Sequence, residues 1–296
     1  MRVQTVIGVD IGGSKTHGIR AVDGHPVAEA VAGSANLAAV GAEEAGRQLA
    51  AVFTRLDASE TEAVCVGAAG ADGTESIATI TRLVTGLVPG ARVRVVHDAR
   101  LVLAAEGLDE GAALISGTGS VAWGRRTDGT HARAGGWGHL LGDEGSGYRV
   151  AIDAVRHALD GMDAGVPADP LTAALVADCG LTDRTELIDF VYGRQDRRYW
   201  AERAAVVARL AAHGEPAATR IVDDAADALA ALATRVLERL DLPGPVVLGG
   251  GFAVHQPLVQ QAVRTRLAGA EVHLLTHPPA VGALRLAAAL PQMETL

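Results

Sequence analysis

The stretch IGVDIGGSKTHGIRAVDG, residues 7–24, decides the fold because its pattern recurs later in the chain. ALISGTGSVAWGRRTDG, residues 113–129, aligns with it so that Gly13 meets Gly119 and Ser14 meets Ser120. Each copy reads as a buried apolar strand, a turn of small residues, a second strand and an Asp-Gly hairpin signal before a third strand. This internal repeat predicts two related halves that are rich in β-strands.

Helical patterns and short apolar strands fill the rest of the chain. In the first half we expect a helix at 43–56, a strand at 63–69, a helix at 76–87, a strand at 92–97 and a helix that begins at Asp98. In the second half we expect helices at 146–159, 170–178, 185–192, 200–212 and 217–240, a strand at 245–248, a helix ending at Leu267, a strand at 271–275 and a last helix from Ala280. These patterns indicate an α/β protein whose second half is longer in helix.

The composition argues against several kinds of partner. The chain has 296 residues and a formal net charge of −9, and its 26 basic residues include a single lysine, Lys15. An acidic chain has no general electrostatic attraction for nucleic acid, and no apolar run reaches the roughly 18 residues of a membrane span. Two cysteines, Cys65 and Cys179, cannot form a framework of bridges or a four-thiolate metal site. We therefore expect a cytoplasmic protein with reduced thiols that binds neither nucleic acid nor membranes.

Two loops of small residues occupy equivalent places in the two copies, Gly12-Gly13-Ser14-Lys15-Thr16 and Gly117-Thr118-Gly119-Ser120. Without Cβ obstruction, their backbone N–H groups and hydroxyls can approach phosphate oxygens. The first loop lacks the spacing and the following helix of a Walker loop. Residues 117–122 fit a dinucleotide fingerprint, but a strand follows where that fingerprint needs a helix. Paired loops therefore favour a phosphate site over two ordinary tight turns.

A third glycine cluster, Gly249-Gly250-Gly251, lies between an apolar strand and a helix. Three consecutive glycines would admit a flat ring against bare backbone. A plain turn between a strand and a helix would need only one glycine. The cluster is therefore a candidate for nucleoside binding.

Two aspartates follow predicted strands and are candidates for chemistry. Asp10 ends the first strand, where its carboxylate could hold a water of a magnesium ion that bridges nucleotide phosphates. Asp98 lies between a strand and a helix, which suits an N-cap residue. The same position suits a general base that accepts the proton of a substrate hydroxyl during phosphoryl transfer. Both descriptions can hold for Asp98.

The segment GGWGHLLGDEGSGY, residues 135–148, is too rich in glycine for a helix and ends in a helix cap at Asp143 or Ser146. Its tryptophan and carboxylates suit a polyol site, in which carboxylates accept hydroxyl hydrogen bonds and a ring packs on carbon-bound hydrogens. His139 has no second His or Cys at ligand spacing, so we expect an ordinary hydrogen bond and no metal.

Three motifs together, at residues 10–16, 115–120 and 135–146, resemble the BadF/BadG/BcrA/BcrD-type ATPase family in its N-acetylglucosamine kinase branch. The resemblance covers almost the whole chain with the motifs in the family's order. It implies the actin, Hsp70 and sugar-kinase architecture, with two ribonuclease H-like domains and a central cleft between them. Residues 1–110, with helix 280–296 packing back on them, would form the first domain, and residues 111–279, with a helical insertion, the second.

The resemblance also implies ATP- and Mg²⁺-dependent phosphorylation of an amino sugar, N-acetylglucosamine at its 6-hydroxyl, by a homodimer with Asp98 as base. The residues implied for nucleotide and metal are Asp10, Gly12, Gly13, Ser14, Lys15, Thr16, Gly117, Thr118, Gly119, Ser120, Gly249, Gly250 and Gly251. Those implied for the sugar are Asn36, Gly70, Thr118, Gly136, Trp137 and Asp143. Without that role, Asn36 would be only a helix cap.

Three alternatives stay open at this point. Glucosamine or N-acetylmuramic acid could replace N-acetylglucosamine as the substrate. The chain could also be a regulatory nucleotide-binding protein without sugar kinase activity. Related ATPase activators of dehydratases hold an iron–sulfur cluster through cysteines of the second domain, and a lone Cys179 disfavours that role.

Overall fold

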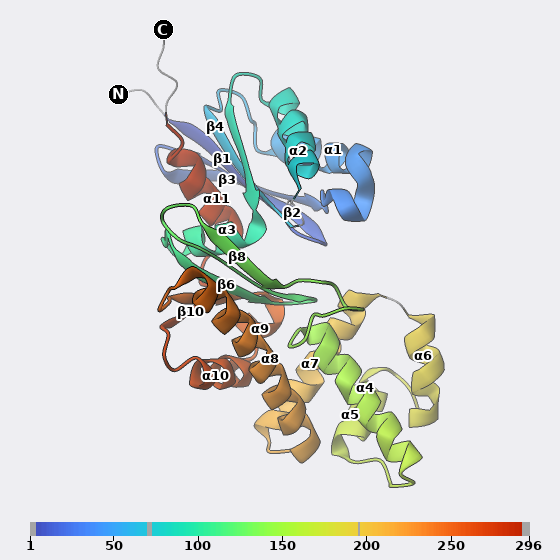
Figure 1. The fold of residues 1–296 in the computed structure, drawn as a ribbon. Coiled ribbons are helices and arrows are strands. Elements are labelled where there is room, and N and C mark those ends of the chain that lie inside the picture. The colour runs from blue at the N-terminus through green and yellow to red at the C-terminus, as the bar shows by residue number, and fades with distance from the viewer. Residues whose placement is uncertain (1–3, 70–72, 195, 292–296) are drawn as a thin grey trace. The chain divides into compact units, whose positions relative to one another are not determined.

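The computed structural model describes residues 4–69, 73–194 and 196–291, and its internal contacts divide the chain into two compact units. Unit 1 comprises Met1–Asp109 and Leu275–Leu296, and unit 2 comprises Glu110–Leu274. Each unit contains one five-stranded sheet with helices (Figure 1).

The sheet of unit 1 begins with an antiparallel meander and continues with parallel strands. Its order is β3-β2-β1-β4-β5. The strands are β1 (Thr5–Ile11), β2 (Lys15–Val22), β3 (His25–Gly33), β4 (Ala63–Ala68) and β5 (Arg92–His97). β1 pairs antiparallel with β2 and parallel with β4, and β4 pairs parallel with β5.

Helices cover both faces of this sheet (Figure 1). α1 (Leu37–Arg55) and α2 (Thr74–Leu87) pack on one face, and α3 (Asp98–Ala105) and α11 (Pro279–Ala288) pack on the other. The alternation of β1 explains this arrangement, because Ile7 and Ile11 belong to the cluster with α1 and α2, whereas Val6 belongs to the cluster with α11. Cys65 on β4 is fully buried, as its apolar surroundings in the sequence indicate.

The sheet of unit 2 has the same plan. Its order is β10-β9-β6-β7-β8. The strands are β6 (Gly111–Ser116), β7 (Ser120–Arg125), β8 (His131–Gly135), β9 (Val246–Gly249) and β10 (Val272–Leu274). The meander β6-β7-β8 corresponds to β1-β2-β3, and the parallel strands β9 and β10 correspond to β4 and β5. The prediction of two related β-rich halves is therefore confirmed.

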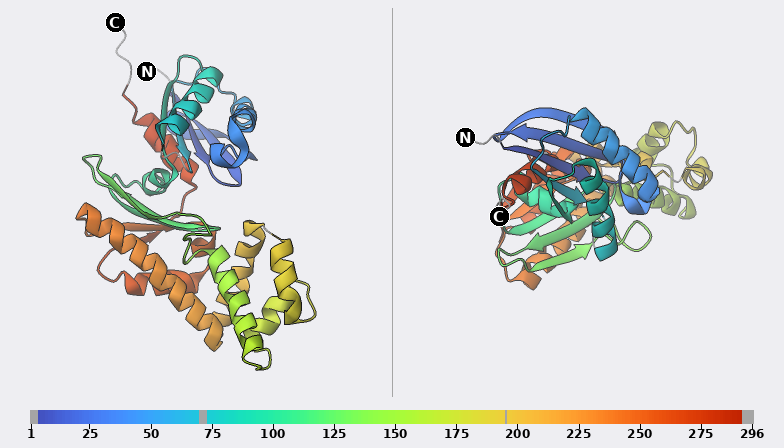
Figure 2. Two further views of the ribbon diagram at one scale, coloured as in Figure 1. Left: turned by 45° about the vertical axis from the view of Figure 1, so that its right-hand side comes forward. Right: turned by 90° about the horizontal axis from the view of Figure 1, so that it is seen from above.

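Unit 2 carries most of the helix. Its helices are α4 (Gly147–Asp163), α5 (Pro170–Asp178), α6 (Leu187–Gly193) after the 3₁₀ turn Arg184–Glu186, α7 (Arg197–Ala212), α8 (Pro216–Leu240), α9 (Gly251–His255) and α10 (Pro257–Arg266). α4 to α7 gather beside one end of the sheet in this unit (Figure 2). In the part of the chain that the structure describes, no helix combines the length and the apolar character needed to cross a membrane.

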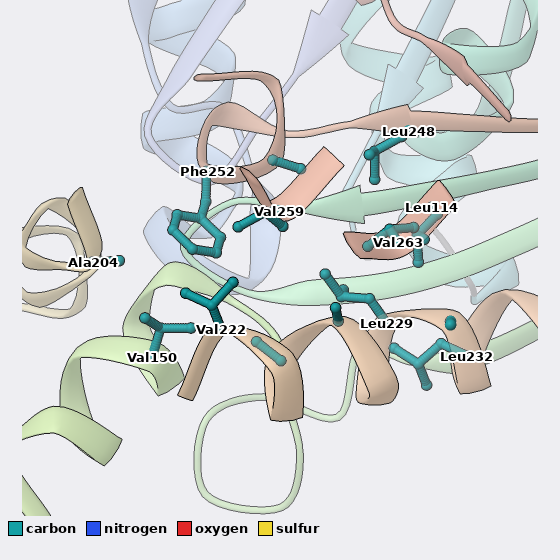
Figure 3. Packing of buried hydrophobic residues seen from close by; sticks show 14 of the residues in the cluster. Leu114, Val150, Ala204, Val222, Leu229, Leu232, Leu248, Phe252, Val259 and Val263 are labelled. Carbon is teal, nitrogen blue, oxygen red and sulfur yellow. The ribbon is translucent and has the colours of Figure 1, made fainter. Parts of the chain in front are cut away.

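The core of unit 2 forms between its sheet and α8, α9 and α10, and it extends to buried residues of α4, α5 and α7 (Figure 3). Leu229 of α8 points toward Leu114 on β6, and Val259 and Val263 of α10 join the same buried cluster (Figure 3). Because α8 is amphipathic over 25 residues, it buries one long apolar stripe against the strands and against α4, α7 and α10.

Several predicted element boundaries differ from the structure. The helix expected from Glu43 begins at Leu37, because Asn36 caps it there, and Gly41 interrupts its helical geometry. The helix expected to run to Leu267 is split into α9 and α10 at Gln256. The last helix ends at Ala288, so the expected helix through 296 is wrong in extent, and residues 292–296 lie outside the described chain. Of the two predicted caps before α4, Ser146 is the N-cap residue.

Close backbone packing joins α11 to its neighbours in unit 1. A Cβ atom at Gly8 on β1 would lie 2.3 Å from the backbone nitrogen of Leu284. A Cβ atom at Gly282 on α11 would lie 2.0 Å from the carbonyl oxygen of Leu101 on α3. Both positions therefore need glycine for space, and neither has a positive φ.

We predict that Gly282→Ala lowers the free energy of unfolding by about 2 kcal/mol or more, because α11 must move away from α3. Gly86→Ala is the matched control, since Gly86 also lies in a helix but its added methyl would meet nothing within 4 Å. That control should leave stability unchanged or raise it by about 0.5–1 kcal/mol through helix propensity. Urea unfolding followed by circular dichroism measures both variants. Equal effects of the two substitutions would contradict the close packing of α11.

Candidate functional site

The parallel strands of unit 1 bring distant parts of the sequence to one edge of the sheet. Ile11 at the end of β1 is paired with Ala68 of β4, and Ala68 is paired with His97 of β5. The carboxyl ends of these strands are therefore level. Asp10 and Asp98, which are far apart in sequence, lie at this edge, where ligands of open α/β sheets commonly bind.

The surroundings of Asp10 disfavour its charged form. Burial in the protein, and then the negative charge of Asp98, raise the pKa of Asp10 to about 7, and Lys15 opposes the shift. Asp98 and Lys15 are therefore both close enough to act electrostatically on Asp10. A carboxyl group held in this way is a candidate to receive a positive charge from a ligand.

Asp98 is the first residue of α3, and its neighbours fix one of its oxygens. The N-cap residue is His97, so the description of Asp98 as the N-cap is wrong. Oδ1 of Asp98 accepts the Ala99 N–H at 2.8 Å and lies 2.9 Å from Nδ1 of His97. The Asp98 side chain is 25% exposed. The carboxylate is thus oriented and still reachable.

The first glycine loop of unit 1 is a tight turn with an open tip. The N–H of Gly12 donates to the carbonyl of Lys15 at 2.9 Å, and the Ser34 hydroxyl donates to the carbonyl of Gly12 at 2.9 Å. Gly13, Ser14 and Lys15 are exposed. Their backbone and side chains are therefore available to an incoming phosphate.

Thr16 differs from its neighbours in that loop. It is fully buried, and its Oγ1 accepts the N–H of Ala35 at 2.9 Å. Its hydroxyl therefore holds the loop from the protein interior. Because Thr16 has no accessible surface in the described structure, it cannot make the predicted contact with a nucleotide there.

Asn36 connects two segments near this edge. Its Oδ1 accepts the Ala38 N–H at 3.0 Å, which caps α1. Its Nδ2 donates to the carbonyl of Ala69 at 3.2 Å, directly after β4. The cap is thus present, and the sugar contact stays a prediction. Gly70, the next predicted sugar residue, lies outside the described residues.

The second glycine loop, in unit 2, is tied to the glycine-rich segment that precedes α4. Oγ of Ser120 donates to the carbonyl of Glu144 at 2.7 Å, and Oγ of Ser116 donates to the carbonyl of Gly145 at 2.7 Å. The N–H of Ser120 donates to Oδ1 of Asp143 at 3.2 Å. The structure therefore brings together the second and third motifs of the sequence.

Asp143 and Trp137 lie in the same segment with opposite exposure. Asp143 is buried, and a Cβ atom on Gly119 would lie 3.0 Å from both of its carboxylate oxygens. A methyl group at Gly119 would therefore require the Asp143 carboxylate to shift slightly. Trp137 is 65% exposed and is free to pack against a ligand. His139 stacks edge-on against Tyr148, and no metal cluster is found among the described residues.

The third glycine cluster packs against the second glycine loop. A Cβ atom at Gly250 would lie 2.4 Å from the Ser116 carbonyl oxygen, and its φ is +90°. Gly251, in contrast, has nothing within 4 Å of such an atom. Gly250 is thus required by packing and backbone geometry, whereas Gly251 faces open space.

That open space belongs to a cavity of about 430 Å³ in unit 2. Its lining residues are Gly117, Thr118, Arg198, Ala201, Glu202, Ala205, Gly251, Phe252, His255 and Gln256. Four of them come from α7, in a region where the sequence showed no motif. These residues are spaced three and four apart, which places them on one face of the helix, and Nε of Arg198 donates to Glu202 at 3.2 Å. This spacing is the sequence signal from which they could have been identified.

Comparisons with known proteins agree with these motifs. The model of the BadF/BadG/BcrA/BcrD ATPase family matches residues 7–287. The chain is 35% identical over 253 residues to an N-acetylmuramic acid/N-acetylglucosamine kinase of Clostridium acetobutylicum, covering 82% of each protein. It is 29% identical over 315 aligned positions to an N-acetyl-D-glucosamine kinase of Dictyostelium discoideum, covering 97% and 98%. A solved structure from Chromobacterium violaceum, provisionally named an N-acetylglucosamine kinase, superimposes with a TM-score of 0.74 at 26% identity, covering 96% of this chain and 99% of that one.

The raised pKa of Asp10 leads to a prediction about stability. Between pH 4 and about 7 the folded chain holds a proton on Asp10 that the unfolded chain has lost, so this group lowers stability as pH rises through that window. Asp10→Asn should therefore be more stable than the unsubstituted chain at pH 8, by up to about 4 kcal/mol, and equally stable near pH 4. Denaturant unfolding across this pH range measures the difference. A difference that does not change with pH would contradict the environment described for Asp10.

Proposed function

Because the chain belongs to the BadF/BadG/BcrA/BcrD ATPase family, we propose that it transfers the γ-phosphoryl group of ATP to the 6-hydroxyl of N-acetylglucosamine. The relatives identify the chain as a sugar kinase, and the substrates in the names of those relatives are amino sugars. The observation that carries the proposal is the pair Asp10 and Asp98 at the carboxyl edge of one sheet. The shared strand order of the two units supports their assignment as ribonuclease H-like domains.

Asp98 is the proposed general base. As the sugar oxygen attacks the γ-phosphorus, the hydroxyl proton passes to the Asp98 carboxylate, and the bond to the bridging oxygen of ADP breaks. The Ala99 N–H donates to Oδ1, which supports a fixed orientation of the carboxylate. The accessible part of the side chain is available for the hydroxyl.

Asp10 is the residue proposed to hold Mg²⁺. Hard cations prefer oxygen ligands, and the closeness of a second carboxylate makes the surroundings of Asp10 favourable for positive charge. The ion would neutralise charge on the phosphates. Lys15, exposed in the adjoining loop, would add a positive charge near the same groups.

Nucleotide phosphates are proposed to bind the open parts of both glycine loops, and the nucleoside is proposed to occupy the cavity of unit 2. Gly251 leaves room there for a ring against bare backbone. The N-terminal half of α7 lines the same cavity. Asn36, Gly70, Thr118, Gly136, Trp137 and Asp143 are proposed for the sugar.

N-acetylmuramic acid is the second candidate substrate. The relative from Clostridium acetobutylicum carries both amino sugars in its name, which supports testing both. The two sugars differ by a lactyl ether that adds a carboxylate. A pocket that accepts both sugars must therefore have space for the lactyl group or leave that group exposed to solvent.

Steady-state assays with ATP and Mg²⁺ across N-acetylglucosamine, N-acetylmuramic acid, glucosamine and glucose test the proposal. We expect ADP formation to depend on sugar and to show the highest kcat/KM with N-acetylglucosamine. ADP formation that no sugar stimulates would favour a regulatory ATPase and overturn the kinase assignment. A higher kcat/KM with N-acetylmuramic acid would replace the substrate and keep the reaction.

We predict that Asp98→Asn lowers kcat by about 10²–10⁴-fold, because the amide cannot accept the hydroxyl proton. Binding of ATP, measured by calorimetry, should be nearly unchanged. Glu75→Gln is a matched control, since Glu75 also lies in the first turn of a helix in unit 1. Unchanged turnover in Asp98→Asn, or an equal loss in both variants, would remove Asp98 from the role of base.

A further inference from the structure

The segment after β8 has a backbone that only glycine adopts easily. Gly135 and Gly136 have φ values of +74° and +71°, and Gly138 has a φ of +83°. A Cβ atom at Gly136 would lie 2.8 Å from Nη2 of Arg133 and 3.0 Å from the side chain of Val121. Glycine has many accessible conformations when unrestrained, so a run of glycines needs outside contacts to keep one geometry.

Arg133 on β8 supplies three such contacts. Its Nε donates to the carbonyl of Gly135 at 3.1 Å, and its Nη2 donates to the carbonyl of Gly136 at 2.5 Å. Its guanidinium carbon lies 5.1 Å from the centre of the Trp137 ring. One side chain therefore holds three consecutive residues, with two charge-assisted hydrogen bonds and one cation–π contact.

The same segment is also hydrogen-bonded to the second glycine loop. The N–H of Gly136 donates to the carbonyl of Ser120 at 2.9 Å. Ser120 in turn binds Asp143 and Glu144 on the far side of the segment. Trp137 lies between these anchors and is 65% exposed, so much of its ring does not touch protein. The Arg133 guanidinium is therefore a main constraint on the orientation of the Trp137 ring before any ligand binds.

We propose that Arg133 is a positioning residue for sugar recognition, which orders Gly136 and Trp137 before the sugar arrives. The inference rests on the proposed function, because those two residues contact sugar only there. A binding surface that is already ordered spends less free energy on ordering when the ligand binds. The planar fork of arginine can reach two carbonyls and stack on a ring at once, which the single ammonium of lysine cannot do.

Kinetics of Arg133→Met and Arg133→Lys test this role. We expect the KM for sugar to rise about tenfold or more in both variants, with kcat and the KM for ATP within about threefold of the unsubstituted enzyme. Arg126→Met is the matched control, because Arg126 also donates to a backbone carbonyl of unit 2, that of Leu240 at 2.8 Å, but lies outside this segment. An unchanged sugar KM in both Arg133 variants, or an equal rise in the control, would overturn the inference.

A double substitution separates positioning from direct contact. If Arg133 acts through Trp137, Trp137→Phe combined with Arg133→Met should raise the sugar KM about as much as the larger single effect. Multiplying single effects would show that Arg133 acts independently of Trp137, and would contradict the ordering of Trp137 by Arg133.

Tryptophan fluorescence gives a readout that needs no turnover. Trp123 and Trp200 are buried at 7% and 1% exposure, so acrylamide quenches mainly Trp137. We expect Arg133→Met to increase quenching by about half or more, because the stacked guanidinium is lost. If the unsubstituted protein phosphorylates no sugar, the proposed function fails, and unchanged quenching in Arg133→Met would separately overturn the role of Arg133.

Discussion

Pairing of parallel strands in register is the interaction on which the rest of the structure depends. In unit 1, hydrogen bonding of β1 to β4 and of β4 to β5 makes Ile11, Ala68 and His97 level with one another. In unit 2, the pairing of β6 with β9 places Ile115 beside Gly249. In unit 1, a slip of one residue would exchange the side chains of the two buried faces, so the distinct apolar clusters on these faces fix the register. Loops that leave the strands of each sheet are thereby brought to one edge of that sheet.

Small residues then allow those loops to approach one another. Gly119 accommodates the Asp143 carboxylate, and Gly250 accommodates the backbone of Ser116. A methyl group added at Gly119 would push on the Asp143 carboxylate, which could shift slightly. A methyl group added at Gly250 would clash with the backbone of Ser116, which cannot move aside as the end of a flexible side chain can. The glycine content of the motifs thus has two causes. Some glycines make room for other parts of the protein, and others, such as Gly251, leave open space for a ligand.

The sequence predicted the architecture well because its signals are local. The repeat in residues 7–24 and 113–129, the strand at 92–97 and the helix at 170–178 all depend on patterns within short windows, and the structure contains them. Other features depend on contacts between distant segments. Burial of Thr16, whose hydroxyl accepts the N–H of Ala35 from another segment, could not be predicted from local pattern. Arg133 was also missed, because its partners are backbone carbonyls that carry no sequence signal.

The most direct test of the account is the identity of the reaction product. We would incubate the protein with ATP, Mg²⁺ and N-acetylglucosamine labelled with ¹³C, and record carbon and phosphorus NMR spectra of the product. The account predicts phosphorus coupling at C6, with a matching loss of the ATP γ-phosphorus signal. Coupling at C1 or another carbon, or inorganic phosphate in place of a sugar phosphate, would contradict it.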